Sequence, residues 1–424
     1  MIARAAILST GDELTTGRIA DTNAQWIADR LFEIGVEVVC VLVVGDFPER
    51  LEWAWRQALE RADLVISTGG IGPTADDLTT ETVARVVGVG LVMDEPSADT
   101  MRRFFAARGL DPMPENNLKQ AMIPAGAVVV PNALGTAPGY RAALGGKHVV
   151  VLPGVPREMK PMLERSVLPW LRAQRGGEVY LARTFQTFGI SESGLDQLVA
   201  GVVDRAEGRI SFRASFPEVS LRVVVHGTPE HAEAGLAAVG ERLRARLGEY
   251  CYGEGPLTME EAVGRALRAH ALTLAVAESC TGGLVAHRVT NVPGSSAYFL
   301  GGIGAYANAA KRTLLAVPED TLARHGAVSE EAARAMAAGA RRAFGADLAV
   351  ATTGVAGPDG GTPEKPVGFV CFALASADGV RSATHQLWGT RDWVKLLASQ
   401  IALDMVRRQA LGLGPHDPLL FRRR

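Results

Sequence analysis

The segment AESCTGG, residues 277–283, stands where a strand is expected to turn into a helix. The apolar run at residues 272–276 is typical of a buried strand, and residues 284–286 are typical of the start of a helix. Backbone N–H groups at such a turn point outward, and the helix dipole favours negative charge there. The Ser279 hydroxyl and the Cys280 thiol therefore stand in suitable positions for a nucleophile whose attack creates an oxyanion.

Length and composition indicate a globular protein of several domains. The chain has 424 residues, too many for one ordinary core, with 47% hydrophobic and 21% charged residues. Its formal net charge of −2 argues against a global attraction to nucleic acid. No apolar run reaches the roughly 18 residues that a membrane span needs. We therefore expect neither a direct nucleic-acid partner nor a membrane partner.

Cysteine and histidine usage points to a cytoplasmic location. The four cysteines lie far apart without a C-x-x-C pair, and the eight histidines are scattered. This pattern favours reduced thiols and argues against a zinc site built from Cys and His. The N-terminus reaches Asp12 and Glu13 early, which is unlike a signal peptide.

Residues 1–170 alternate strand and helix signals. Strands are expected at 3–8, 36–44, 63–67 and 148–152, with helices at 21–34 and 48–61, from about Leu78, and after 153–156. Short apolar strands that alternate with amphipathic helices predict a doubly wound α/β domain.

Residues 178–250 predict a small α+β module. Strands are expected at 179–188, 209–214 and 219–226, with helices at 191–203 and 228–247. The module lacks a G-x-x-G loop of the kind that clamps nucleic acid, so we expect a spacer or dimerisation element and, with it, a homodimer. Residues 253–256 resemble a linker. Residues 257–412 then predict a third domain, again α/β, with a helix at 330–344 and a strand at 367–375.

Lys311 lies in the first turn of a predicted helix. The expected strand at 299–306 is followed by Asn308, a good N-cap. A cation at this end of a helix is disfavoured by the dipole. One interpretation is a surface lysine that reaches solvent. The other is a catalytic amine whose pKa is lowered by the dipole and by partial burial, so that it serves as a base.

The neighbourhood favours the catalytic interpretation. Ser279 and Lys311 each follow a strand, and a third strand at 347–352 ends in the amide-rich loop at 353–361. Because the carboxyl ends of such strands converge on one rim, these groups suit acyl transfer by a Ser–Lys arrangement. Arg391, at the start of the last helix, is suited to hold an anionic group such as a phosphate.

Cys280 is a rival nucleophile, because a helix N-terminus also lowers the pKa of a thiol. No histidine is placed in the sequence to serve it, and the alternative is a small buried thiol. We favour Ser279.

Four segments, residues 277–283, 306–311, 353–358 and 388–391, resemble the C-terminal domain of the CinA family, a nicotinamide mononucleotide deamidase. The resemblance implies hydrolysis of nicotinamide mononucleotide to nicotinic acid mononucleotide and ammonia, without a cofactor. The family's serine nucleophile, lysine and tyrosine fall on Ser279, Lys311 and Tyr306. Where relatives commonly place an arginine four positions after Arg391, this chain has Lys395, which keeps the charge but not the bidentate fork. The expected substrate-binding residues are Thr281, Gly282, Gly283, Asn308, Thr353, Gly354, Gly357 and Arg391.

The segment TGGIGPTADD, residues 68–77, follows a strand and opens a helix in the first domain. One interpretation is a tight turn with Asp77 as an ordinary N-cap. The other starts from the adjacent carboxylates of Asp76 and Asp77, which would repel a phosphate in this loop unless a cation intervened. They therefore point to Mg²⁺ or another divalent cation that bridges carboxylate and pyrophosphate.

Three further polar turns, residues 11–13, 132–139 and 153–158, are expected near the same rim, and together they favour a cleft. The expected metal ligands are Asp77, Asp76, Asp12 and Glu158, and the expected substrate-binding residues are Gly70, Gly72, Asn132, Gly135 and Gly154.

These N-terminal segments also resemble the CinA family, and the loop that holds Asp77 is similar to one in molybdopterin-binding proteins. The resemblance implies a metal-dependent ADP-ribose pyrophosphatase that yields AMP and ribose 5-phosphate. The expected ligands of the whole chain are therefore nicotinamide mononucleotide and ADP-ribose. Two alternatives stay open: a molybdenum-cofactor-related binding protein that uses the first domain alone, and a non-catalytic partner in competence or recombination.

Overall fold

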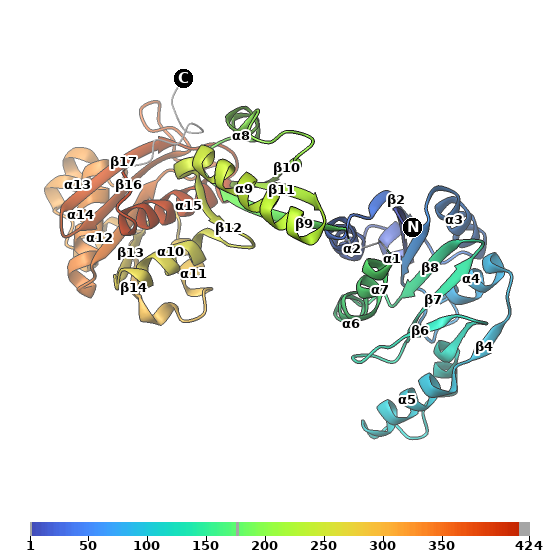
Figure 1. Ribbon diagram of the computed structural model, residues 1–424. Helices are drawn as coiled ribbons and strands as arrows, with labels where there is room; N and C mark the ends of the chain where they lie inside the picture. The colour runs from blue at the N-terminus through green and yellow to red at the C-terminus, as the bar shows by residue number, and fades with distance from the viewer. Residues whose placement is uncertain (1, 175–177, 415–424) are drawn as a thin grey trace. The chain divides into compact units, whose positions relative to one another are not determined.

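The computed structural model describes residues 2–174 and 178–414 (Figure 1). The chain divides into two compact units, residues 1–182 with 224–236, and residues 183–223 with 237–424. No helix in the described ranges combines the length and the apolar character needed to cross a bilayer.

The N-terminal domain is built on a six-stranded sheet of order β2-β1-β3-β8-β7-β6. The first four strands, β2 (Glu37–Val44), β1 (Arg4–Thr10), β3 (Leu64–Thr68) and β8 (Lys147–Leu152), are parallel. The last two, β7 (Gly139–Leu144) and β6 (Val128–Val130), run antiparallel to their neighbours. The carboxyl ends of β1, β3 and β8 therefore share one edge, where the polar turns predicted from the sequence begin.

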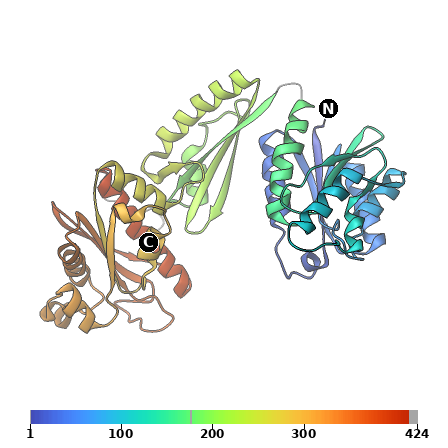
Figure 2. The same cartoon turned by 90° about the horizontal axis from the view of Figure 1, so that it is seen from below.

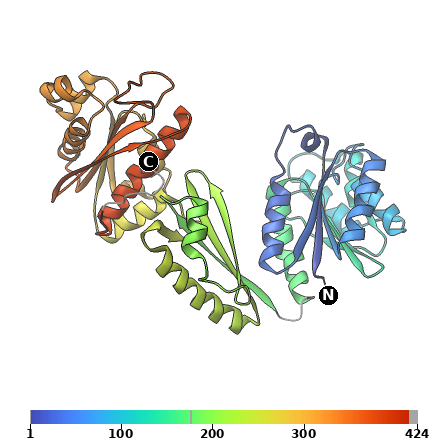
Figure 3. The ribbon, with the colours of Figure 1, turned by 90° about the horizontal axis from the view of Figure 1, so that it is seen from above.

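Helices cover both faces of this sheet (Figures 2 and 3). Ala5 and Ile7 of β1 pack with α2 (Thr22–Glu33), α6 (Pro156–Met162) and α7 (Leu168–Ala173). Ala6 and Leu8 point to the other face, toward α3 (Pro48–Arg61) and α4 (Thr79–Val87). Since successive residues of a strand face opposite sides, an unbroken apolar strand needs helices on both. The predicted doubly wound α/β fold is confirmed.

The remaining N-terminal elements lie beside this core, and the sequence analysis did not predict them. They are α1 (Asp12–Thr15), β4 (Leu91–Met93), α5 (Glu95–Ala106), a 3-10 helix at Glu115–Ala121, β5 (Met122–Pro124) and a π-helical turn at Leu163–Val167. Strands β4 and β5 form a small antiparallel pair.

The middle module carries a four-stranded sheet of order β10-β11-β9-β12. Its elements are β9 (Val179–Thr187), α8 (Glu192–Val199), β10 (Arg209–Ser215), β11 (Glu218–Gly227), α9 (Pro229–Leu247), a 3-10 helix at Gly248–Tyr250 and β12 (Cys251–Glu254). Two predictions were wrong here. Helix α8 ends before residue 203, because Ala200 leaves the helical conformation and Gly201 follows with positive φ. The expected linker begins inside β12, which pairs antiparallel with β9.

The C-terminal domain has a five-stranded sheet of order β14-β13-β15-β16-β17. Strands β14 (Phe299–Gly304), β13 (Leu274–Glu278) and β15 (Leu348–Gly354) are parallel, and β16 (Phe369–Ser376) and β17 (Gly379–Gln386) are antiparallel. One face packs on α10 (Met259–Ala269), α11 (Leu284–Thr290) and α15 (Arg391–Ala410). The other packs on α12 (Asn308–Leu315), α13 (Glu319–His325) and α14 (Glu330–Phe344), and a 3-10 helix at Ser295–Ala297 precedes β14.

Alanine lines the contact between the C-terminal sheet and α14. Ala275 and Ala349 of the sheet meet Ala333 and Ala337 of the helix, and all four are fully buried. Small side chains let a helix approach a sheet closely, so the alanine-rich sequence sets the short distance between α14 and the sheet. Helix α14 has the bounds predicted from the sequence.

Helix α15 also contacts the middle module within the second unit. The ring of Phe216 stacks on that of Trp393 with centroids 4.3 Å apart. The Gln400 side chain donates a hydrogen bond of 2.6 Å to Glu218, whose pKa is raised by burial. The module is thus packed against the helix that begins at Arg391.

Candidate active sites

Ser279 directly follows β13, at the carboxyl edge of the C-terminal sheet. Its amide donates a hydrogen bond of 2.9 Å to the Thr352 carbonyl of β15, and its side chain is largely buried. Gly282 and Gly283 adopt φ of 61° and 94°, a region that residues with a Cβ rarely occupy. These glycines let the chain reverse within four residues and enter α11, which leaves Ser279 at the edge of the sheet.

Lys311 is fully buried, and its Nζ lies 3.1 Å from Ser279 Oγ. The same nitrogen donates to the carbonyl oxygens of Ala305 at 2.8 Å and Tyr306 at 3.1 Å. A neutral amine has two N–H bonds and one lone pair. If the two carbonyls take the two hydrogens, the lone pair is left for the hydroxyl of Ser279. Burial lowers the pKa of Lys311 below its ordinary 10.5, which favours this neutral form.

Cys280 differs from Ser279 in its surroundings. The thiol belongs to the hydrophobic core of the domain, and burial raises the pKa of Cys280 to about 12. A thiol with such a pKa is protonated at neutral pH and is a poor nucleophile. The geometry favours the packing role for Cys280.

Glu278 stabilises the turn that holds Ser279, and the sequence analysis did not single it out. Its buried carboxylate accepts hydrogen bonds from the amides of Gly283 and Val285, both at 3.0 Å, and of Ala286 at 2.9 Å. The amide of Gly282 donates to the Ser279 carbonyl. The amides of Gly282 and Gly283, two of the expected substrate-binding residues, are therefore already used within the turn.

Thr281 supplies the amide that stays available. Within residues 2–174 and 178–414 its N–H has no hydrogen-bond acceptor, while its hydroxyl bonds to that of Thr352 at 2.7 Å. The capping of these amides by Glu278 could be recognised only from the structure. A glutamate at the end of a strand gives no capping signal in the sequence by itself.

We expect Glu278→Ala to lower the free energy of unfolding by about 3 kcal/mol, because the amides of Gly283, Val285 and Ala286 would lose their side-chain acceptor. Glu278→Gln keeps one carbonyl acceptor and should lose less. Urea unfolding followed by circular dichroism measures both variants. Equal stability of Glu278→Ala and the unaltered protein would contradict this role.

Tyr306 and Arg391 meet at the rim of the same site. Tyr306 is 65% exposed and lies two residues beyond β14, not inside it as expected. Arg391 Nη2 donates to the Tyr306 hydroxyl at 3.1 Å, and Nη1 donates to the Gly357 carbonyl at 2.7 Å. Lys395 lies one helical turn later, and a Cβ placed on Gly282 would come 3.8 Å from its Nζ. Lys395 thus lies beside the Ser279 turn, and Arg391 contacts Tyr306, whose carbonyl binds Lys311.

Of three other expected binding residues, Thr353 and Gly354 have structural roles, whereas Asn308 has an exposed side chain. Asn308 is the first residue of α12 and is exposed, while Ala307 is the N-cap and the Asn308 side chain makes no cap. The buried Thr353 hydroxyl donates to the Ala327 carbonyl at 2.7 Å. Gly354 still belongs to β15, where it pairs with Val370. The loop therefore starts later than expected, because strand pairing continues through Gly354.

The N-terminal domain has a cleft of about 610 Å³ at the carboxyl ends of β1, β3 and β8. Gly70, Gly72 and Gly154 line it, as expected. Its carboxylates come from Glu13, Asp46, Asp76, Asp77 and Glu158, and no Lys or Arg is among the described residues that line it. Asn132 and Gly135 lie instead in an adjoining hollow.

Asp46 replaces Asp12 in this cleft. The Asp12 carboxylate accepts a hydrogen bond of 3.2 Å from the Asp46 amide and does not line the cleft, so the structure separates Asp12 from the other expected metal ligands. Burial and the nearby charges of Asp12, Glu13 and Asp76 raise the pKa of Asp46. The Gly45-Asp46 turn follows β2 as the Gly11-Asp12 turn follows β1. The same Gly-Asp pattern after a strand could therefore have identified Asp46 from the sequence.

The carboxylates of two more predicted metal ligands, Asp77 and Glu158, accept hydrogen bonds from neighbouring residues. The Asp77 carboxylate accepts a 2.8 Å hydrogen bond from the Thr74 amide and another from the Thr74 hydroxyl, while Leu78 is the N-cap of α4. Glu158 accepts a hydrogen bond of 2.8 Å from Asn132 Nδ2. Hydrogen bonds from Thr74 and its own amide lower the pKa of Asp76.

The carboxylates of the cleft match Mg²⁺ in donor type, since hard cations prefer oxygen ligands. Across the described ranges, however, no three His, Cys, Asp or Glu side chains gather closely enough to hold a metal ion. A cation in this cleft would therefore have to share its coordination with ligand phosphates.

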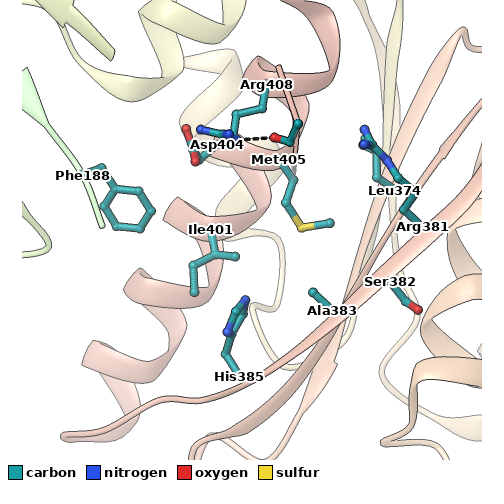
Figure 4. Close-up of a pocket in the computed structure, with 11 residues that line it drawn as sticks. Phe188, Leu374, Arg381, Ser382, Ala383, His385, Ile401, Asp404, Met405 and Arg408 are labelled. Atoms are coloured by element: carbon teal, nitrogen blue, oxygen red, sulfur yellow. Dashed lines mark hydrogen bonds between the residues drawn. The ribbon is translucent and has the colours of Figure 1, made fainter. Parts of the chain in front are cut away.

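A separate cavity of about 70 Å³ lies between β17 and α15 (Figure 4). Its walls include Phe188, Leu374, Ile401 and Met405, and Arg408 beside it donates to the Gly414 carbonyl. None of the predicted binding or catalytic residues lines it.

Comparison with known proteins matches every part of this architecture. Residues 257–410 match the family model described as "CinA C-terminal domain", residues 6–173 match "Probable molybdopterin binding domain", and residues 182–253 match "Damage-inducible protein CinA KH domain". The KH character of the middle module was missed because the module lacks the G-x-x-G loop that marks nucleic-acid-binding KH domains.

Relatives extend the match to the full length. A CinA-like protein of Geobacter sulfurreducens is 45% identical over 96% of this chain and 99% of its own length. A CinA-like protein of Geotalea uraniireducens is 43% identical over 96% of this chain and 98% of its own. A solved structure, the protein CinA from Thermoplasma acidophilum, is 39% identical over 39% of this chain and 95% of its own, with a TM-score of 0.37. The chain therefore belongs to the CinA family.

Proposed function

We propose that the C-terminal domain hydrolyses the carboxamide of nicotinamide mononucleotide by a Ser–Lys mechanism. The observation that carries the proposal is the 3.1 Å contact between the Nζ of the buried Lys311 and Ser279 Oγ, with two carbonyl oxygens also bound to Nζ. The substrate comes from the family resemblance, and the cations of Arg391 and Lys395 fit its phosphate.

Lys311 acts as the base in the first step. Its lone pair takes the hydroxyl proton while Ser279 Oγ bonds to the carboxamide carbon, and the carbonyl π electrons move to oxygen. The amide of Thr281, which has no acceptor among the described residues, would donate to that oxyanion. Lys311 then returns the proton to nitrogen, the C–N bond breaks, and ammonia leaves an ester on Ser279. Water attacks this ester with Lys311 again as base, which releases nicotinic acid mononucleotide and restores the hydroxyl.

Arg391 and Lys395 bind the phosphate in this proposal. Arg391 has its guanidinium fixed by Gly357 and Tyr306, so it presents a fixed direction to an anion. Tyr306 thereby acts as a positioning residue at the rim, through its hydroxyl on Arg391 and its carbonyl on Lys311.

Incubation of the protein with nicotinamide mononucleotide tests the assignment. Chromatography should detect nicotinic acid mononucleotide and ammonia in equal amounts, with or without EDTA. Unchanged substrate after prolonged incubation would refute it.

We further propose that the N-terminal domain cleaves ADP-ribose in the presence of a divalent cation. The five carboxylates around the cleft, with no lining cation among the described residues, support this second activity. Asp76 and Asp77 are the residues that would hold the cation, together with the pyrophosphate. When bound, it would neutralise phosphate charge and polarise the phosphorus that is attacked.

Asp77→Ala is expected to reduce metal-dependent ADP-ribose cleavage by at least about 100-fold, and deamidation should stay within about twofold. The matched variant is Asp77→Asn, which keeps an acceptor for Thr74 but loses the charge. It should be as inactive as Asp77→Ala. Full activity of Asp77→Asn would show that residue 77 only shapes the loop. AMP and ribose 5-phosphate are quantified by chromatography, with and without EDTA.

A further inference from the structure

The cavity of about 70 Å³ in the C-terminal domain lies between α15 and β17, the edge strand of the sheet (Figure 4). On one face of the sheet the Ser382 hydroxyl donates a hydrogen bond of 2.7 Å to Glu330 of α14. Successive residues of a strand point to opposite faces, so Arg381, Ala383 and His385 point to the other face, toward α15. Ala383 has the smallest of these three side chains and lines the cavity, so it leaves space between the strand and the helix.

Apolar side chains make up most of the cavity wall. Leu374 and Ala383 lie on the side of the sheet, Ile401 and Met405 lie on the side of α15, and Phe188, just after β9 of the middle module, completes the set. An apolar cavity of about 150 Å³ holds a benzene molecule, so half that volume suits an aliphatic chain of about three carbon atoms.

Arg408 brings a buried cation to this apolar space. Its Nε donates to the Gly414 carbonyl at 2.8 Å, and its Nη2 donates to the Glu249 carboxylate at 2.6 Å. The third nitrogen, Nη1, is buried and has no hydrogen-bond acceptor among the described residues. Because an unpaired buried donor costs free energy, Arg408 is suited to bind one more acceptor.

Arg381 adds a second guanidinium group to the wall. It is exposed, and its guanidinium makes no hydrogen bond or ion pair within residues 2–174 and 178–414. Asp404 also lines the cavity, but its Oδ1 accepts hydrogen bonds of 2.8 Å from both Nε and Nη2 of Arg407. Two guanidinium groups thus stand against one carboxylate that is already paired, and this balance favours an anion.

We propose that the cavity binds a short-chain monocarboxylate. Its aliphatic tail lies between Leu374, Ile401 and Met405, and its carboxylate accepts hydrogen bonds from Arg408 Nη1 and Arg381. Inorganic phosphate fits poorly, since it has no apolar part to cover these walls. The proposal is independent of both activities proposed above, because no residue assigned to either of them lines this cavity.

The methyl group of Met405 gives a direct test of occupancy. In protein isotopically labelled at its methionine methyl groups, butyrate should shift the nuclear magnetic resonance signal of Met405 in a saturable way. Met336 is the control, because it is buried on the opposite face of the sheet and should keep its position. Acetate has the charge without the tail and butyramide the tail without the charge, so each should bind at least about tenfold more weakly than butyrate.

Two variants locate the binding to the cavity. Ala383→Leu fills the space and Arg381→Met removes the exposed guanidinium, and each should weaken butyrate binding by at least about fivefold. Arg342→Met is the matched control, since Arg342 is exposed on α14 and does not line the cavity. Unchanged signals of the distant methionines show that each variant is folded. The proposal fails if butyrate leaves Met405 unshifted, if acetate or butyramide binds as well as butyrate, or if either folded cavity variant binds butyrate normally.

Discussion

Ser279→Ala is expected to abolish ammonia release from nicotinamide mononucleotide, with a loss of about 10⁴-fold or more in kcat. The variant loses the oxygen that would form the ester, and water in its place is neither activated nor held against the carboxamide. Coupled-enzyme detection of ammonia measures the loss. Binding of the substrate, followed by titration calorimetry, should survive, because the phosphate contacts of Arg391 and Lys395 are untouched.

Cys280→Ala is the matched control, since it removes the neighbouring nucleophile from the same turn. It should keep most of the activity, because the thiol, with a pKa of about 12, stays protonated at neutral pH. An active Ser279→Ala with an inactive Cys280→Ala would reassign the nucleophile and end the Ser–Lys proposal.

Lys311→Met is expected to lower kcat by about 10²–10⁴-fold, the range typical of a lost general base. Methionine has a similar length and suits a buried site, so the fold should persist. Arg312→Met is the control on the next residue, where the cation is exposed and paired with Glu319, and its activity should stay near that of the unaltered protein.

The pH profile separates a base from a merely structural lysine. Only the neutral amine accepts the Ser279 proton, so kcat/KM of the unaltered protein should rise with pH as Lys311 deprotonates. The midpoint of this rising limb should lie below pH 10.5, because burial lowers the pKa of Lys311. In Lys311→Met the rising limb should disappear. A variant that keeps both the limb and its midpoint would show that another group is the base.

The local elements of this protein were predicted well where capping and periodicity are strong. Asp21 caps α2, Ser191 caps α8, and α14 has the predicted bounds, because each depends on neighbours within one turn. Helix α5 and strands β4 and β5 were missed, since these short or outlying elements lack a strong apolar period. The doubly wound fold and the family were both confirmed.

The candidate sites were predicted less completely than the fold. The sequence analysis expected Ser279 and Lys311 to follow strands whose carboxyl ends converge on one rim, and in the structure their side chains meet. It named Asp12 instead of Asp46 for the acidic cleft, and it named Gly282 and Gly283 as binding residues although their amides are used within the turn. Each error concerns which atom a side chain or an amide points to, and strand ends alone do not determine that.

Sequence by itself determined the main strands and helices of each domain, the turns at which polar groups follow strands, and the family. These depend on apolar period, glycine conformation and capping, all of which act over a few residues. Only the tertiary structure decided that Glu278 takes three amides of α11, that two carbonyls hold Lys311 against Ser279, and that the cleft gains a second hollow beside α5. The reason is physical: hydrogen bonding and burial depend on distances between atoms that the chain brings together only when the sheets are assembled.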